Sequence, residues 1–271
     1  MNPSTTYNYL TEYVNELRSK GRYSFTIPEL HQRFELSENA LKKALQRSKQ
    51  KKEIALIRKE FYVIVPPEYR SRGVLPPALF IADLMHFLSH KYYTGLLSAA
   101  AFYGAAHQQP QEFFVITTKP FLLPVKSNKI KINFCHKKHL PEQGIIERKT
   151  DTGYLKVSSA ELTALDLVFF YDRVGGMNRV ATVLQELAES LDAEKLVIAA
   201  KRYEQIAAIQ RLGFLLDVIL DQKTVVSPLL SYLKTVRHYP VLLRPQKERP
   251  DTMATGNEWK VVPNIEIDTD L

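Results

Sequence analysis

Residues 37–65 constrain the fold most strongly, because they join an amphipathic helix to two β-rich runs. Ser37 can cap a helix that runs to about residue 50. At about 100° per residue, the small and apolar side chains of this helix fall on one side. They are Ala40, Leu41, Ala44, Leu45 and Ser48. The stretch IALIRKEFYVIV follows at 54–65 and predicts a hairpin with a tight turn at 58–60.

The residues before this helix predict two more helices and a short strand. Residues 5–20 carry apolar side chains at helical spacing and stop at Gly21. After an extended piece at 23–25, Thr26 and Glu29 form the T-x-x-E pattern of a capping box and open a second helix. Helix, short strand, helix, helix and hairpin is the order of a winged helix-turn-helix. The third helix is then the recognition helix.

The outward face of this third helix mixes basic side chains with amides. Lysine and arginine bind phosphates, whereas asparagine and glutamine also read base edges. We therefore expect double-stranded DNA as a partner. The predicted contacts are Asn39, Lys42, Lys43, Gln46, Arg47, Lys49 and Gln50 on the helix, with Arg58 and Lys59 at the hairpin turn. The competing interpretation is a charged helix face that is merely solvated.

The distribution of charge favours DNA binding over simple solvation. Residues 1–73 hold fourteen Lys and Arg against eight Asp and Glu, whereas residues 74–271 hold twenty-three against twenty-one. Most of the net charge of +8 is therefore in the first quarter of the chain. Such asymmetry is typical of a segment that contacts nucleic acid or another acidic surface.

A proline-rich joint at about 66–77 predicts a domain boundary. We expect a winged helix-turn-helix domain at 1–73 and a larger mixed α/β domain, rich in helices, at 74–271. Strand patterns at 112–118 and 130–134 and a hairpin around 151–153 precede a strongly helical region from 159 to about 236. The expected fold class is therefore α+β.

Four stretches of the second domain carry a resemblance to a known family. They are KYYTGLLSAAAFYGAAHQQPQEFFVIT (91–117), LDLVFFYDRVGGMNRVATVLQELAESLD (165–192), QRLGFLLD (210–217) and NEWKVVPN (257–264). With the winged helix, they resemble the AbiEi antitoxins of bacterial type IV toxin–antitoxin systems. Arg211, within QRLG, sits among apolar residues, which favours a structural role over a functional basic face.

The resemblance implies a non-enzymatic repressor of its own bicistronic operon. It implies that the winged helix binds inverted repeats in the operator. The second domain counteracts a nucleotidyltransferase toxin from the adjacent gene, and direct contact with the toxin is not required. Some members of the family are linked to abortive infection. We expect no cofactor and no metal.

Two other functions stay open from the residues alone. Asp251, Glu258 and Lys260 echo the acid…acid-x-Lys pattern of metal-dependent nucleases, although the bland interpretation is a loop and a strand. Alternatively, the second domain senses a small molecule in a ligand-responsive transcription regulator. The segment CHKKH contains Cys135, His136 and His139, but a surface loop explains it better than zinc.

Composition indicates the compartment. The single cysteine, Cys135, excludes an internal disulfide and is typical of a reducing environment. The N-terminal residues MNPSTTYNYL lack the features of a signal peptide, and no run of about 18 apolar residues predicts a membrane span. We expect a cytoplasmic protein without membrane contact.

Overall fold

The structure, a computed structural model, describes residues 3–105, 112–127, 130–245 and 256–268. It separates into two compact units. The first unit comprises residues 1–92, 111–138 and 147–156, and the second comprises residues 93–110, 139–146 and 157–271. A boundary between domains at residues 73 and 74 stays a prediction. The elements mix helices and strands, as the α+β class requires.

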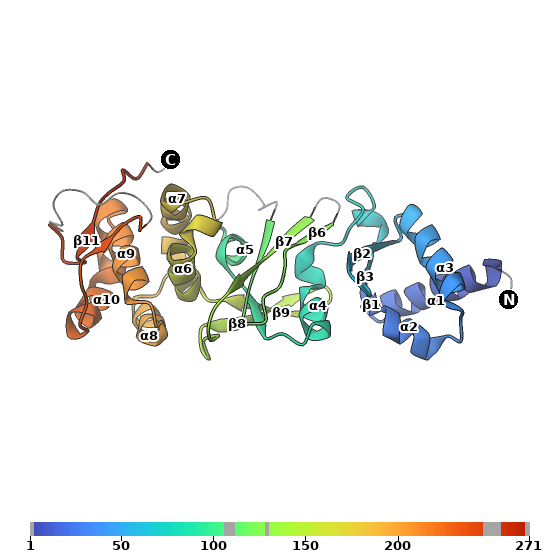
Figure 1. The fold of residues 1–271 in the computed structure, drawn as a ribbon. Coiled ribbons are helices and arrows are strands. Elements are labelled where there is room, and N and C mark those ends of the chain that lie inside the picture. Colours follow the sequence, from blue (N-terminus) through green and yellow to red (C-terminus); the bar gives the residue numbers. More distant parts are fainter. Residues whose placement is uncertain (1–2, 106–111, 128–129, 246–255, 269–271) are drawn as a thin grey trace. The chain divides into compact units, whose positions relative to one another are not determined.

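The N-terminal elements follow the predicted order of helix, short strand, helix, helix and hairpin (Figure 1). They are α1 (Pro3–Ser19), β1 (Ser24–Thr26), α2 (Ile27–Arg33), α3 (Glu38–Gln50), β2 (Ile54–Arg58) and β3 (Phe61–Ile64). The three strands form an antiparallel sheet in the order β1-β3-β2. Beneath it lies one apolar core that includes Leu10, Phe25, Leu30, Leu45 and Ile64.

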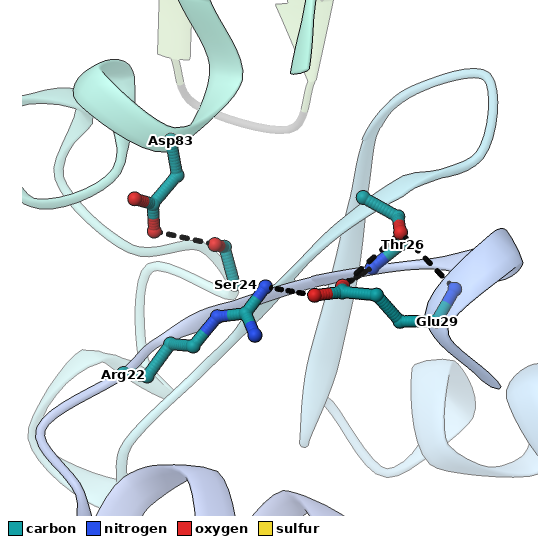
Figure 2. Close-up of polar contacts among 5 residues, drawn as sticks. All are labelled: Arg22, Ser24, Thr26, Glu29 and Asp83. Carbon is teal, nitrogen blue, oxygen red and sulfur yellow. Dashed lines mark hydrogen bonds and ion pairs between the residues drawn. The ribbon is translucent and has the colours of Figure 1, made fainter. Parts of the chain in front are cut away.

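Side-chain caps determine where α2 and α3 begin. The backbone N–H of Thr26 donates to Glu29 Oε2 at 2.7 Å, and the Glu29 N–H donates back to Thr26 Oγ1 at 3.4 Å, which completes the predicted capping box (Figure 2). The Arg22 guanidinium binds the same carboxylate. Burial alone would raise the pKa of Glu29, but the hydrogen bonds from Arg22 and Thr26 outweigh it and lower that pKa. Ser37 caps α3 in the predicted way, by accepting from the N–H of Ala40.

The segment after the hairpin leads into a six-stranded sheet. It contains 3₁₀ turns at Pro67–Tyr69, Pro77–Leu79 and Ala101–Tyr103, the helices α4 (Ile81–Phe87) and α5 (Leu96–Ala100), and the strands β4 (Tyr92–Thr94), β5 (Glu112–Thr117), β6 (Val125–Ser127), β7 (Ile130–His136), β8 (Ile145–Thr150) and β9 (Gly153–Ser158). The strand order is β6-β7-β5-β4-β9-β8. The predicted strands and hairpin are confirmed, whereas the three-residue β6 was not expected.

From residue 160 to residue 235 the chain is mainly helical, as predicted. It contains α6 (Ala160–Phe169), α7 (Met177–Leu187), α8 (Ala193–Arg202), α9 (Ile206–Phe214) with a π turn at Leu215–Ile219, α10 (Lys223–Thr235) and 3₁₀ turns at Tyr171–Arg173 and Ala188–Ser190. Gly175 and Gly176, at φ of +102° and +97°, separate α6 from α7. Within the described residues, no helix has the length and apolar character needed to span a membrane.

A parallel pair of short strands, β10 (Val241–Leu242) and β11 (Val261–Val262), packs beside α9. Gln210 Nε2 donates to the carbonyl oxygen of Trp259 at 2.9 Å, and Arg211 Nε donates to that of Leu242 at 2.9 Å. The indole N–H of Trp259 donates to Asp217 Oδ2 at 2.8 Å. The QRLGFLLD motif therefore fixes the closing strands, which agrees with the structural interpretation of Arg211.

Candidate nucleic-acid interface

Helix α3 has one buried and one exposed side. Leu41, Ala44, Leu45 and Ser48 are buried against the core of the first unit. All seven predicted contact residues of the helix are exposed: Asn39, Lys42, Lys43, Gln46, Arg47, Lys49 and Gln50. The only acid in the first turn is Glu38, whose carboxylate lies 3.3 Å from His31 Nε2. The exposed side therefore presents cations and amides together, the donor set that binds phosphates and base edges.

The two predicted hairpin residues are placed differently from each other. Arg58 is half-buried and its Nη1 donates to the carbonyl oxygen of Leu123 at 3.4 Å. Lys59, whose side chain is 91% exposed, lies at the tip with its Nζ 3.7 Å from Glu60 Oε1. An exposed ion pair of this length is weak and easily exchanged. Lys59 therefore reaches into solvent, whereas Arg58 also ties the hairpin to the segment before β6.

A groove of about 720 Å³ extends this surface at the C-terminal end of α3. Lys49 and Gln50 of α3 line it together with Lys52, Arg72 and Ser127. The sequence patterns assign no role to Lys52, or to Arg72, which lies within the proline-rich joint. Nothing in local patterns indicates that residue 127 lies beside residue 56, where Ser127 Oγ donates to the Leu56 carbonyl at 3.0 Å.

The nuclease alternative finds no assembled site in the described part of the chain. Asp251 lies outside the described residues. The Glu258 carboxylate binds Lys234 Nζ in an exposed ion pair, and Lys260 Nζ lies 3.5 Å from the carbonyl oxygen of His238. Each of these two side chains therefore has a contact that explains it without a metal.

The CHKKH segment likewise forms no ligand cluster among the described residues. Cys135 is buried in β7, where it packs as a small apolar side chain. His136 Nε2 accepts the backbone N–H of Leu122 at 3.0 Å. His139 is exposed beyond the end of the strand.

The second unit contains a buried carboxylate that sequence patterns did not single out. Asp166 of α6 is fully buried. Its Oδ2 accepts the hydroxyl of Tyr93 and its Oδ1 accepts the hydroxyl of Tyr203, both at 2.7 Å. Burial, and then the neighbouring Asp166 charge, raise the pKa of Tyr203 well above 10. The three side chains join β4, α6 and the residue that follows α8.

We predict that Tyr203→Phe changes how stability depends on pH. The pKa of Tyr203 is higher in the folded chain than the ordinary tyrosine value of 10. The neutral hydroxyl therefore stabilises the folded chain below pH 10, and this stabilisation is lost as the pH rises further. Tyr203→Phe should lower stability near neutral pH by about 1–3 kcal/mol, because Asp166 loses one hydroxyl donor. It should also reduce the fall in melting temperature above pH 10. Differential scanning calorimetry at increasing pH measures both effects.

Tyr154→Phe is the matched control for this prediction, because Tyr154 is 64% exposed. It should match the unsubstituted chain at every pH. An equally steep alkaline fall for Tyr203→Phe and the unsubstituted chain would contradict the assigned role of the Tyr203 hydroxyl.

The second unit also has a cavity of about 410 Å³. Its lining is largely apolar and includes Leu162 and Ile198, while Lys195 and Arg202 add two cations. Glu161 lines it too, and its carboxylate accepts the backbone N–H of Asp192 at 3.2 Å. This volume lies within the range of small-molecule sites.

Known proteins share the fold of this chain and match its residues 93–218. The crystal structure of the RV2827C protein from Mycobacterium tuberculosis has a similar fold, with a TM-score of 0.63 and 14% sequence identity over 94% of this chain and 90% of that one. No curated protein matches the chain. Residues 93–218 match the family model of the AbiEi antitoxin C-terminal domain, a range that includes the Asp166 cluster and the QRLGFLLD motif. This match supports an antitoxin of the AbiEi type, a kind of protein that acts in toxin–antitoxin systems.

Proposed function

We propose that the chain is a DNA-binding antitoxin that represses its own operon through a winged helix-turn-helix at residues 1–73. The exposed side of α3 carries this proposal, because it gathers cations and amides on the helix that follows the α2–α3 turn. The element order and the sheet order β1-β3-β2 support the winged-helix assignment.

The chemistry of the α3 side chains divides the proposed contacts into two kinds. Lys42, Lys43, Arg47 and Lys49 bind phosphates and set affinity. Asn39, Gln46 and Gln50 are able to pair with base edges in the major groove and set sequence preference. At the hairpin, Lys59 reaches the DNA phosphate backbone beside the major groove, and Arg58 supports this contact. The operator then consists of inverted repeats, each read by one such helix.

The C-terminal domain provides the antitoxin activity in this proposal. The AbiEi match supports a regulatory role. In this proposal the protein is not an enzyme and needs no cofactor. The system is of type IV, so the domain counteracts a nucleotidyltransferase toxin encoded by the adjacent gene without direct contact being required. The protein works in the cytoplasm, without a membrane partner, and resembles a family some of whose members are linked to abortive infection.

An electrophoretic mobility shift assay tests the DNA-binding half. Increasing protein is added to the promoter fragment of its own operon and to a scrambled fragment at the same salt. We expect selective, stepwise retardation of the promoter fragment. Equal weak retardation of both fragments would reduce the α3 surface to a generic basic face and refute specific repression.

Co-expression tests the antitoxin half. The adjacent gene is induced in cells with and without this chain, and growth is measured. We expect growth arrest that the chain relieves. Arrest that persists despite abundant, folded protein would refute antitoxicity toward that gene product.

The 410 Å³ cavity favours one further candidate function, a ligand-responsive regulator. Its apolar lining with Lys195 and Arg202 suits an anionic small molecule with an apolar part. A ligand that binds the folded chain raises its melting temperature. A reproducible rise with one such anion, abolished by Lys195→Gln, would favour this candidate, and unchanged melting across a panel of them would count against it.

A further inference from the structure

The groove at the end of α3 is built from three separate parts of the first unit. Lys49 and Gln50 come from α3, Ser71–Gly73 from the joint, and Ser127 from the end of β6. Several contacts hold these parts in place. Ser127 Oγ donates to the Leu56 carbonyl at 3.0 Å, and the Gly73 N–H donates to the Tyr69 carbonyl at 3.0 Å.

Lys52 is positioned by a left-handed turn that ends α3. The backbone φ of Lys52 is +56°. Its N–H donates to the Lys49 carbonyl at 3.0 Å, and the N–H of Glu53 donates to the Ser48 carbonyl at 3.0 Å. The turn therefore places the Lys52 side chain on the wall of the groove instead of along the helix axis.

The charge of the groove is one-sided. Lys49, Lys52 and Arg72 are all exposed, and their side chains make no hydrogen bond or ion pair with any described residue. The lining residues all lie in the described ranges, and none of them is a carboxylate. The Ser71 hydroxyl and the Gln50 amide supply further donors. Such a set of cations and neutral donors suits phosphate oxygens.

The lining also favours a nucleic-acid polymer over a free nucleotide as the ligand of the groove. No lining residue is aromatic, so the groove has no ring against which a base would stack. Lys49 and Gln50 belong both to the exposed side of α3 and to the groove. A DNA duplex bound on the exposed side of α3 would therefore extend into the groove.

We propose that this groove binds the phosphodiester backbone of the DNA flanking the site read by α3. The inference rests on the proposed DNA binding and extends the protein's footprint beyond the predicted helix and hairpin. Lys52 and Arg72 are phosphate-contact residues that affect affinity for every sequence and add no sequence preference.

The test uses the full-length double variant Lys52→Gln/Arg72→Gln and fluorescence anisotropy of the labelled promoter fragment. Each lost phosphate contact lowers the slope of log K against log salt by about 0.9, so two contacts lower it by about 1.8. At about 0.1 M salt this corresponds to about 60-fold weaker binding. On the shortest duplex that the unsubstituted chain still binds, the loss should disappear, because the flanking phosphates are absent.

Lys91→Gln/Lys138→Gln is the matched control. It makes the same change in net charge, both lysines are exposed residues of the first unit, and neither lines the groove. Its affinity should stay within about threefold, because screening limits the reach of a surface charge to about 10 Å. Equal melting temperatures of all the variants check that the fold is intact.

Other outcomes would overturn the inference. If the groove variant binds the promoter fragment as well as the control does, while Lys42→Gln/Lys43→Gln weakens it, the groove is not part of the interface although DNA binding stands. An equal loss on long and short duplexes would refute the flanking position. A melting shift with ATP that the groove variant alone abolishes, with unchanged DNA affinity, would assign the groove to a free phosphate compound. If the unsubstituted chain binds no promoter DNA, the proposed function and this inference both fail.

Discussion

Replacing Lys42 and Lys43 with glutamine should weaken binding of the promoter fragment by about 60-fold at about 0.1 M salt, because two phosphate contacts are lost. Both lysines are exposed on α3, and neither side chain makes a hydrogen bond or ion pair with another described residue. The substitution therefore removes ligand contacts and little else. Fluorescence anisotropy over a salt series measures both the affinity and its salt dependence.

The control is again Lys91→Gln/Lys138→Gln, which carries the same net charge as the Lys42/Lys43 variant. Melting temperature should be unchanged in both proteins, since none of these lysines contributes to a core. In co-expression, the Lys42/Lys43 variant should still relieve growth arrest, because the proposed antitoxin activity lies in the C-terminal domain. An unchanged salt slope would contradict the assignment of α3 as the recognition helix.

The local parts of the fold follow from the sequence because their causes are local. Thr26 and Glu29 are three residues apart and cap α2 through each other, and Ser37 caps α3 in a similar way. The periodicity of α3 separates its buried from its exposed side for the same reason. The exposed side of this helix could therefore be predicted without tertiary information, and its contact with DNA stays a prediction.

The missed parts depend on residues far apart in the chain. Ser127 and Leu56 are 71 residues apart, and no local pattern indicates that β6 passes beside β2. Tyr93 and Asp166 are 73 residues apart. In the sequence, Asp166 is one of three polar residues in a largely apolar helix. Only the fold reveals that two tyrosine hydroxyls bind its carboxylate, and only the fold reveals that Arg58 is partly engaged by the Leu123 carbonyl.

Gly213 illustrates the same limit on a helix. The sequence marks it as a residue that costs a helix about 1 kcal/mol relative to alanine. The structure supplies the reason for a glycine at this position. A Cβ there would lie 2.0 Å from Cζ3 of Trp259, whose ring is fully buried and whose N–H binds Asp217. Helix α9 therefore accepts the indole ring directly against its backbone.

Gly213→Ala should consequently destabilise the chain in spite of its better helix propensity. Overpacking of a buried site costs about 1–3 kcal/mol and sometimes more. The ring has few ways to move, because Gln210 also holds the Trp259 carbonyl. We expect a loss of about 3 kcal/mol or more, which lowers the melting temperature by about 10 °C at 2–4 °C per kcal/mol. Calorimetry of the full chain measures this loss.

A double-mutant cycle identifies the cause. Trp259→Ala alone should cost about 3–5 kcal/mol, because a large buried ring is lost. In that background Gly213→Ala no longer meets the ring and should be neutral, or stabilising by up to about 1 kcal/mol through helix propensity. The coupling between the two sites is then about 3 kcal/mol or more. If Gly213→Ala costs the same with and without the indole, its effect comes from the backbone of α9, and the close approach of Trp259 does not explain the glycine in the QRLG motif.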